Sequence, residues 1–472
     1  MDAQTCAGIR RTPRGRGVDV AALAVTCGTY RRLTAWRRST TLARVDERLT
    51  DPTRIDSIGA GRWAVGVGLY VFTVTRGLDR VNFYALGHWL LTWNHGFVKR
   101  GLMGTLLEPL LWHKDRVQIE TIVSTVSVIV FTSLSIAILW CAGAIVRFGT
   151  GSPRGFFLAP TALAFLGSSG VILMASTLGY LDHVLTGVTL LAIMCVAEGR
   201  LVAAAALSVV GVAVHEIFVL YGLPVVWLAV LLHANLVTGG KVPTRVASLR
   251  RAFPFLLPSL VAIVFVLLAH AEIPAERTAA LRDDLARTGS FKLDQLNGVM
   301  YPLEHGFMQD FAAQAHLSGK RLMDVQIGRV AWPAIFSLFA STSALLAASR
   351  MRWFIPGMAA VVLAPLAIHL LGQDAPRFTN LAVMQAFCCL TTVVLVARPA
   401  LPGIRAAWAL ALLAGLSLTA SLLWKAPLMG GKVDGETAFG IRLMMPAVPV
   451  SAPGPTSHPT ERGLTRPASD PL

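Results

Sequence analysis

Residues Ile119–Val146, IETIVSTVSVIVFTSLSIAILWCAGAIV, form an apolar run that carries a single charge, Glu120. A helix needs about 20 mostly apolar residues to cross the hydrocarbon core of a bilayer, and this run exceeds that length. Arg147 and Arg154 follow it closely. The segment therefore predicts a transmembrane helix that ends in a basic connection.

The composition of the chain extends this interpretation. Of its 472 residues, 54% are hydrophobic and 14% are charged, whereas soluble domains carry about 25% charged residues. A mean hydropathy of +0.61 implies more apolar surface than a water-soluble core could bury. We expect an all-α, polytopic membrane protein.

Similar apolar runs recur along the chain and predict about eleven transmembrane helices. The expected spans are Ile58–Leu78, Ile119–Val146, Phe156–Leu178, Val184–Ala197, Leu201–Val214, Ile217–Leu236, Phe253–Ala271, Val330–Ala348, Trp353–Leu371, Phe378–Ala397 and Ile404–Trp424. Together they predict a transmembrane domain over residues 58–424, with long outside loops at 79–118 and 272–329. We expect a disordered, Arg-rich arm at residues 1–57 and a flexible tail rich in Pro, Gly and Ser at residues 425–472.

The net charge of +16 raises the possibility of nucleic-acid binding, because basic patches attract phosphate backbones. The placement of the charge argues against it. Basic residues follow apolar runs, as Arg350 and Arg352 do, and cytoplasmic connections of membrane proteins carry such residues. They share one side with the amino-terminal arm. The pattern predicts an inner-membrane protein with a cytoplasmic amino terminus, in contact with membrane lipid and not with nucleic acid.

With this orientation, ionisable residues fall at the outer ends of several helices. They are Asp79, Asp182, His183, His215, Glu216, Asp374 and Arg377. Charged groups at membrane depth are costly, so they usually pair with each other or line a cavity. Four separate turns place these residues on the same side of the membrane. We therefore predict that they form one site beyond the outer leaflet. The alternative at each position is a polar residue that simply meets water at a helix end.

The spacing of these residues does not indicate a metal or cofactor. His215 and Glu216 are adjacent, and on a helix they would point about 100° apart. No H-E-x-x-H or similar ligand pattern occurs in the sequence. Asp374 and Arg377 predict either an ion pair within their loop or an arginine that binds phosphate in bidentate fashion.

The first outside loop contains His95-Gly96-Phe97-Val98-Lys99-Arg100-Gly101. Lys99 and Arg100 lie among tryptophans, which anchor segments at the membrane interface. The pair predicts contact with anionic headgroups or, alternatively, capture of a lipid-linked phosphate.

The arrangement over residues 58–424 resembles the GT-C class of membrane glycosyltransferases. The resemblance lies in the first outside loop that opens with an acidic residue in Gly77-Leu78-Asp79-Arg80, in short helical hairpins with Asp182 at the second outside turn, and in the long loop after the seventh span. The segments around Arg100, His215-Glu216 and Asp374–Arg377 also resemble those of bacterial polytopic membrane proteins with no assigned activity.

The GT-C resemblance implies a transferase of the cell envelope that takes a sugar from a polyprenyl-phosphate donor. The acceptor would be an extracytoplasmic glycan or lipid, and the sugar's configuration would invert. It implies a catalytic base at Asp79, although Arg80 stands where the family often has a second acidic residue, so Asp182 is the alternative base. Lys99, Arg100, His183, His215, Glu216, Asp374 and Arg377 would bind the substrate.

Three other functions fit the same sequence pattern. A transporter or a lipid or glycan flippase would place its polar residues on broken helices near the bilayer midplane. A surface-polysaccharide polymerase would depend on outside arginines more than on carboxylates. A scaffold without enzymatic activity would need none of these residues.

Overall fold

A computed structural model describes residues 57–79, 81, 83–94, 100–111, 113–237, 245–268, 275–288, 293–304, 325–370, 375–423, 427–428 and 431–432. Residues 1–56 of the predicted arm and nearly all of the predicted tail lie outside the described residues. The chain divides into two compact units, residues 1–64 and residues 65–472. The first described helix, α3 (Ser57–Gly77), begins in the first unit and continues into the second.

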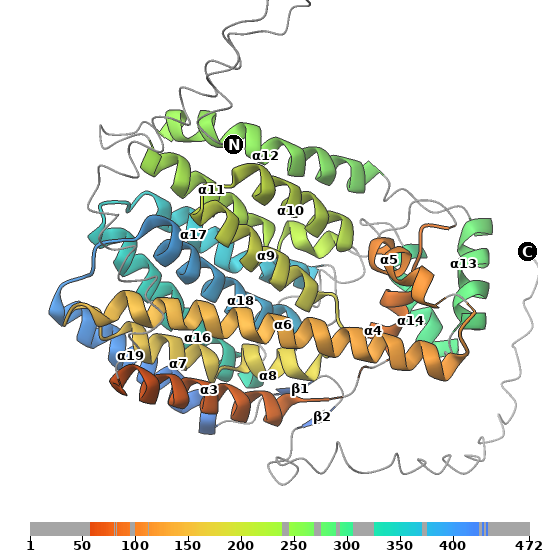
Figure 1. Ribbon diagram of the computed structural model, residues 1–472, viewed down its shortest axis with the longest axis horizontal. Coiled ribbons are helices and arrows are strands. Elements are labelled where there is room, and N and C mark those ends of the chain that lie inside the picture. Colours follow the sequence, from red (N-terminus) through yellow and green to blue (C-terminus); the bar gives the residue numbers. More distant parts are fainter. Residues whose placement is uncertain are drawn as a thin grey trace, which may run out of the picture. The chain divides into compact units, whose positions relative to one another are not determined.

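The described residues are almost entirely helical (Figure 1). After α3 come α4 (Phe83–Leu90), α5 (Gly101–Leu111), α6 (Arg116–Thr150), α7 (Leu158–Leu166), α8 (Ser169–Ser176), α9 (Asp182–Ala197), α10 (Leu201–Val214), η2 (Glu216–Val219), α11 (Leu223–Val237), α12 (Arg245–Leu268), α13 (Ala275–Thr288), α14 (Leu293–Glu304), α16 (Val325–Ala348), α17 (Phe354–Leu363), η3 (Ala364–Leu370), α18 (Ala375–Thr392), η4 (Val393–Ala397) and α19 (Ile404–Leu423). A two-residue ladder pairs β1 (Pro427–Leu428) with β2 (Gly431–Lys432).

Seven helical segments among the described residues are long and apolar enough to cross a membrane. They are Arg116–Thr150, Leu158–Ser176, Glu216–Val237, Val246–Val266, Ala331–Ala348, Pro376–Ala397 and Ile404–Leu423. The chain is therefore a multi-pass membrane protein. The remaining four expected spans coincide with α3, with the shorter helices α9 and α10, and with α17 continued by η3.

The helix α6 shows how local sequence sets these elements. Asp115 caps its first turn, because the Asp115 carboxylate accepts the N–H of Gln118 and the Gln118 side chain accepts the N–H of Asp115. This reciprocal capping satisfies backbone donors that the first turn leaves without partners. The apolar run then continues without a break to the basic end at Arg147.

The most buried helix of the second unit is α18, which packs against α8, α9, α11, α16 and α17. Nearly all residues of the span Pro376–Ala397 are buried, whereas most residues of Ile404–Leu423 in α19 are not. Gln385 of α18 accepts the Gly222 N–H at 2.8 Å and donates to the Val361 carbonyl at 2.7 Å. The Gly222 N–H lies just before α11, and the Val361 carbonyl lies in the last turn of α17. Gln385 therefore satisfies backbone groups at two interruptions of the helical chain, a requirement in the absence of water.

Four helices, α4, α5, α13 and α14, gather at one end of the second unit, on the right of Figure 1. Glycines allow them to approach closely. A Cβ at Gly104 of α5 would lie 1.9 Å from the Leu91 carbonyl oxygen after α4, and a Cβ at Gly87 of α4 would lie 2.4 Å from Val299 of α14. These contacts hold α4 between α5 and α14.

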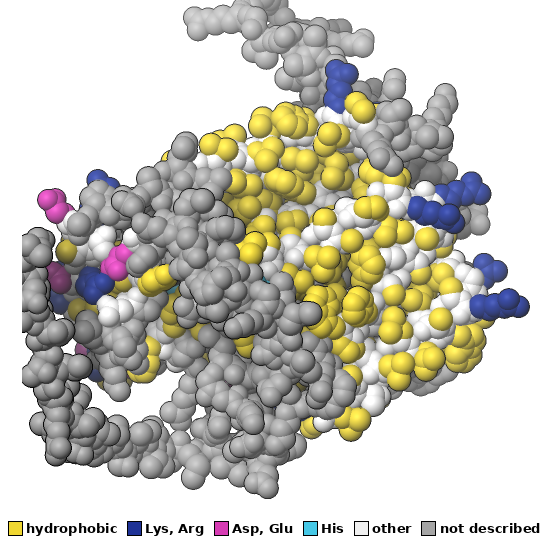
Figure 2. All heavy atoms as spheres, turned by 180° about the vertical axis from the view of Figure 1, so that it is seen from behind, with side chains coloured by type: hydrophobic (Ala, Val, Ile, Leu, Met, Phe, Trp, Pro, Cys, Tyr) yellow, Lys and Arg dark blue, Asp and Glu magenta, His cyan; other side chains and the backbone are white. Residues whose placement is uncertain are grey.

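The surface of the described residues is mostly apolar on the face seen in Figure 2. Hydrophobic side chains cover much of the part that is not grey. Lys and Arg side chains stand at the right edge, and Asp and Glu side chains stand at the left edge together with further Lys or Arg side chains. Large hydrophobic side chains are also exposed on individual helices, among them Val128, Ile129 and Ile136 on α6, and Leu412 and Leu416 on α19. Such a surface is suited to lipid contact.

Candidate functional site

A tight turn before α9 places the first residues of the site. Gly179 adopts φ +91°, a left-handed conformation that glycine tolerates best, and its carbonyl accepts the Trp89 indole N–H at 2.5 Å. His183 lies one residue inside α9, and its ring nitrogens contact the carbonyl oxygens of Met174 at 2.7 Å and Tyr180 at 3.1 Å. The His183 side chain therefore fixes this turn.

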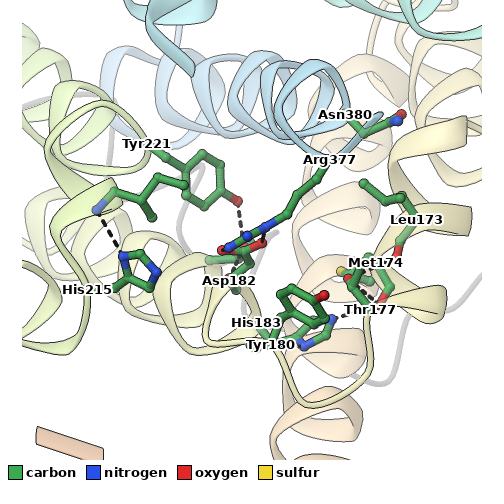
Figure 3. Close-up of polar contacts among 12 residues, drawn as sticks. Leu173, Met174, Thr177, Tyr180, Asp182, His183, His215, Tyr221, Arg377 and Asn380 are labelled. Carbon is green, nitrogen blue, oxygen red and sulfur yellow. Dashed lines mark hydrogen bonds and ion pairs between the residues drawn. The ribbon is translucent and has the colours of Figure 1, made fainter. Parts of the chain in front are cut away.

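Asp182, the first residue of α9, forms a buried ion pair with Arg377 in the first turn of α18 (Figure 3). Arg377 Nε lies 2.6 Å from Asp182 Oδ2, and Nη2 lies 2.8 Å from Oδ1. The two side chains are 6% and 8% exposed. The Arg377 guanidinium also stacks over the Tyr180 ring at 4.8 Å. This bidentate geometry is the strong form of the arginine–carboxylate interaction.

A second ion pair joins Arg100, just before α5, to Glu216 at the start of η2. Arg100 Nε lies 2.9 Å from Glu216 Oε1, and Nη2 contacts the same carboxylate. Arg100 has φ +68° and its side chain is 10% exposed. Burial alone would lower the pKa of Arg100, but Glu216 and Tyr84 raise it above its usual value. Arg100 therefore stays charged.

His215 interrupts the helical path between α10 and η2. Its backbone is extended, with φ −162° and ψ 133°, so the helical angle of about 100° considered for His215 and Glu216 does not apply. The physical reason is that the His215 side chain caps η2: its Nδ1 accepts the Ile217 N–H at 3.1 Å. The same nitrogen lies 3.1 Å from Glu216 Oε2.

Tyr84 and His88 of α4 complete the site, and the sequence prediction did not include them. Arg100 Nη1 lies 3.4 Å from the Tyr84 hydroxyl and 3.2 Å from His88 Nε2. Burial lowers the pKa of His88 well below its usual value, and the charge of Arg100 acts in the same direction. The one sequence signal for this pair is its spacing of four residues, which places both side chains on one helix face.

Aromatic contacts connect the two ion pairs. The rings of Tyr84 and Tyr180 lie 5.7 Å apart, and those of His88 and His215 lie 6.0 Å apart. Tyr180 stacks on Arg377, and Tyr84 contacts Arg100. The structure thus brings Arg100, Asp182, His215, Glu216 and Arg377 into one cluster with Tyr84, His88 and Tyr180, which we call the polar cluster.

Three other predicted site residues remain, Asp79, Lys99 and Asp374. Asp79 follows α3, is exposed, and donates its backbone N–H to the Ala175 carbonyl at 3.4 Å. It therefore lies beside the segment that leads into the Gly179 turn. Lys99 and Asp374 lie outside the described residues.

A cavity of about 20 Å³ adjoins Asp182 and is lined also by His183, Thr186 and Asn380. This is the space of roughly one water molecule. Across the part of the chain that the structure describes, no group of three or more His, Cys, Asp or Glu side chains is arranged as metal ligands.

The polar cluster combines two guanidinium groups, two carboxylates and two imidazoles within a protein that crosses a membrane. Such a set can bind an anionic group and transfer protons. No protein-family model, curated protein or solved structure matches the chain.

Proposed function

We propose that this protein is an integral membrane glycosyltransferase with a GT-C-like helix bundle. It transfers a sugar from a polyprenyl-phosphate donor to an extracytoplasmic glycan or lipid acceptor of the bacterial cell envelope. The observation that carries the proposal is the polar cluster, in which Arg100, from the Gly96–Gly101 segment, meets Glu216, and Arg377 meets Asp182. Arginines suit the phosphate of such a donor because their planar donors match phosphate oxygens.

The proposal includes a defined membrane arrangement. The chain crosses the inner membrane eleven times, with α3, α9, α10 and α17–η3 as the four spans beyond the seven long apolar segments. The amino terminus is cytoplasmic, and the polar cluster lies on the outer side. The clustering of α4, α5, α13 and α14 at one end supports this view, because the two long loops would then lie together outside.

The chemistry requires a base and a cationic environment for the leaving group. An acceptor hydroxyl attacks the anomeric carbon, its proton passes to a carboxylate, and the bond from that carbon to the phosphate oxygen breaks. Attack from the face opposite the leaving group inverts the anomeric centre. Polyprenyl phosphate departs with the bonding electrons, and the guanidinium groups stabilise its growing charge.

The two candidate bases differ in their surroundings. Both oxygens of Asp182 accept hydrogen bonds from Arg377, which stabilises the carboxylate and makes it a weaker base. Asp79 is exposed at the edge of the Gly179 turn. Because an acceptor can reach an exposed carboxylate, Asp79 is the favoured base, and Asp182 positions Arg377.

The test is a transfer assay with the purified protein in nanodiscs. Undecaprenyl-phosphate-linked hexoses and pentoses are supplied singly with a butanol extract of bacterial envelope glycolipids, and release of undecaprenyl phosphate is followed by mass spectrometry. General-base catalysis contributes about 10²–10⁴-fold, so Asp79→Asn should slow release by about 100-fold or more. Absence of release from every donor by wild-type protein, or unchanged rates in both Asp79→Asn and Asp182→Asn, would contradict the proposal.

One observation favours a second candidate, a transporter or flippase. Two spans are interrupted, between α7 and α8 and between η2 and α11, and α17 changes to the 3-10 helix η3. Discontinuous helices form substrate sites in many transporters. Movement of a fluorescent undecaprenyl-phosphate analogue between leaflets of proteoliposomes, without sugar transfer, would favour this candidate.

A further inference from the structure

Four arginines gather where two connections between helices meet. They are Arg350 and Arg352, between α16 and α17, and Arg398 and Arg405, at the two ends of the connection from η4 into α19. Ala400 donates its backbone N–H to Ser349 Oγ at 2.7 Å, and this hydrogen bond holds the two connections side by side. We call the four residues the arginine edge.

The positive charge of the arginine edge is not balanced by nearby carboxylates. All four arginines are exposed, and residues 349–353 and 398–405 contain no Asp or Glu. Within the described parts of the chain, none of the four takes part in an ion pair. An anion from outside the chain would supply the missing charge, and the planar donors of arginine match phosphate oxygens.

The backbone at two of these arginines is unusual. Arg350 has φ +59° and Arg398 has φ +44°, a left-handed conformation that glycine and asparagine tolerate better. A positive charge is favourable near the end of a helix, but an arginine elsewhere in the last turn would provide it without this conformation. Unfavourable backbone conformations concentrate at functional sites, so these two arginines point to a contact outside the chain.

An apolar face of α19 begins beside the arginine edge. Trp408, Leu412 and Leu416 follow Arg405 at intervals of four residues, which places them on one face of the helix, and they are 65%, 66% and 60% exposed. Tryptophan is enriched where a membrane helix meets the headgroups. A cationic end followed by an apolar face matches a molecule with an anionic head and acyl chains, whereas a soluble anion or a nucleic acid would leave the apolar face uncovered.

We propose that the arginine edge binds an anionic phospholipid. Its phosphate lies against the guanidinium groups, and its acyl chains lie along Trp408, Leu412 and Leu416. Four arginines suit two phosphates better than one, so cardiolipin should bind more tightly than phosphatidylglycerol. The chain enters α19 on the left of Figure 1, at the end of the second unit away from α4 and α5, and this site is therefore independent of the transferase proposed above.

Substitution by asparagine removes the charge at a position where asparagine tolerates the backbone. Arg350→Asn and Arg398→Asn should therefore fold as the wild-type protein does, and Arg350→Gly and Arg398→Gly, which relax the same conformation, are the second pair of variants. Arg200→Asn is the matched control, because Arg200 is exposed between α9 and α10 and pairs with Glu198 at 3.0 Å. It changes the net charge by the same amount outside the arginine edge.

Binding is measured by native mass spectrometry of the purified protein in detergent, titrated separately with cardiolipin, phosphatidylglycerol, phosphatidylethanolamine and glycerol 3-phosphate. A basic residue at the membrane surface contributes about fivefold to the affinity for an anionic lipid. We expect Arg350→Asn and Arg398→Asn each to bind cardiolipin about fivefold more weakly, with Arg200→Asn equal to wild type. Binding of phosphatidylethanolamine should be weak and the same in every variant. Thermal unfolding without added lipid checks that each variant is folded.

Equal affinity of the wild-type protein for cardiolipin and phosphatidylethanolamine would overturn the proposal. So would unchanged cardiolipin binding in the folded asparagine or glycine variants, or an equal loss in Arg200→Asn, which would show a general effect of charge. Binding of glycerol 3-phosphate or a short DNA duplex as tightly as cardiolipin would assign the surface to soluble anions and exclude a lipid site.

Discussion

Among single residues, those of the two buried ion pairs matter most to the proposed function. Each joins positions far apart in the chain, 116 residues for Arg100 and Glu216 and 195 residues for Asp182 and Arg377. Each charge was costly to remove from water, and its partner compensates for that cost. Removing one member therefore leaves the other charge buried and unpaired.

A double-mutant cycle on Asp182 and Arg377 tests this coupling. Arg377→Met and Asp182→Leu should each destabilise the protein by about 3–5 kcal/mol, whereas the double variant should lose less than either single variant. Thermal unfolding in detergent, followed by tryptophan fluorescence, measures the effect. Additive losses would show that the pair is not coupled.

The buried His88 predicts a dependence of stability on pH. The unfolded chain protonates this histidine near its ordinary pKa of about 6.5, whereas the folded protein holds its pKa well below that value. Below about pH 6.5 the unfolded state therefore binds more protons, and stability falls as the pH falls.

The same thermal unfolding assay, carried out between pH 7.5 and 5, tests whether stability falls as the pH falls. His88→Gln should show a shallower loss of stability with acidification than wild-type protein, because one of the groups that drives it is gone. Parallel pH profiles for the two proteins would contradict the assignment of a neutral, buried imidazole.

Sequence reasoning found most of these residues but not their partners. The ionisable positions stand out because their flanks are apolar, as at Asp182. The partner of Arg377 could not be deduced, because Asp374 is the nearer carboxylate in the sequence whereas Asp182 arrives from a different helix. His88 was missed because it lies within the mostly apolar helix Phe83–Leu90, where a single histidine gives little signal.

Among the helices, the close packing of α4 and α5 is the contact that positions Arg100. Arg100 directly precedes α5, and Gly104 lets α5 approach the Leu91 carbonyl. A methyl group at Gly104 has no space, because its nearest neighbour is backbone. The helix would have to move, and Arg100 would move with it.

Two glycine substitutions in helices provide a matched test. Gly104→Ala should destabilise the protein by about 1–3 kcal/mol through overpacking and weaken polyprenyl-phosphate binding. Gly187→Ala in α9, where a Cβ meets nothing within 4 Å, should be neutral or stabilise by up to about 1 kcal/mol. Equal effects on thermal unfolding would exclude tight packing at Gly104 as the cause.

The positions of the helices were largely predictable, and their interruptions were not. Each apolar run in the sequence coincides with one or more helices, because hydrophobicity over about 20 residues is a strong local signal. The interruption between η2 and α11, inside one expected span, depends on Gln385, which satisfies backbone groups near Gly222 from another helix. Such contacts between helices that are distant in the sequence cannot be deduced from the pattern of apolar residues.

For the complete chain, every functional statement depends on the side of the membrane that the polar cluster faces. Arg350 and Arg398 lie in connections expected inside, and the Gly179 turn in one expected outside. If the cluster were cytoplasmic, an extracytoplasmic sugar acceptor could not reach it.

Cysteine labelling in intact cells tests this sidedness most directly. In a variant without its native cysteines, Asn94→Cys reports on an exposed position after α4, and Pro153→Cys reports on an exposed position between α6 and α7. We predict that a membrane-impermeant maleimide labels Asn94→Cys on intact cells and labels Pro153→Cys only after the membrane is permeabilised. The reverse pattern, or labelling of both from outside, would contradict the proposed orientation and the transferase with it.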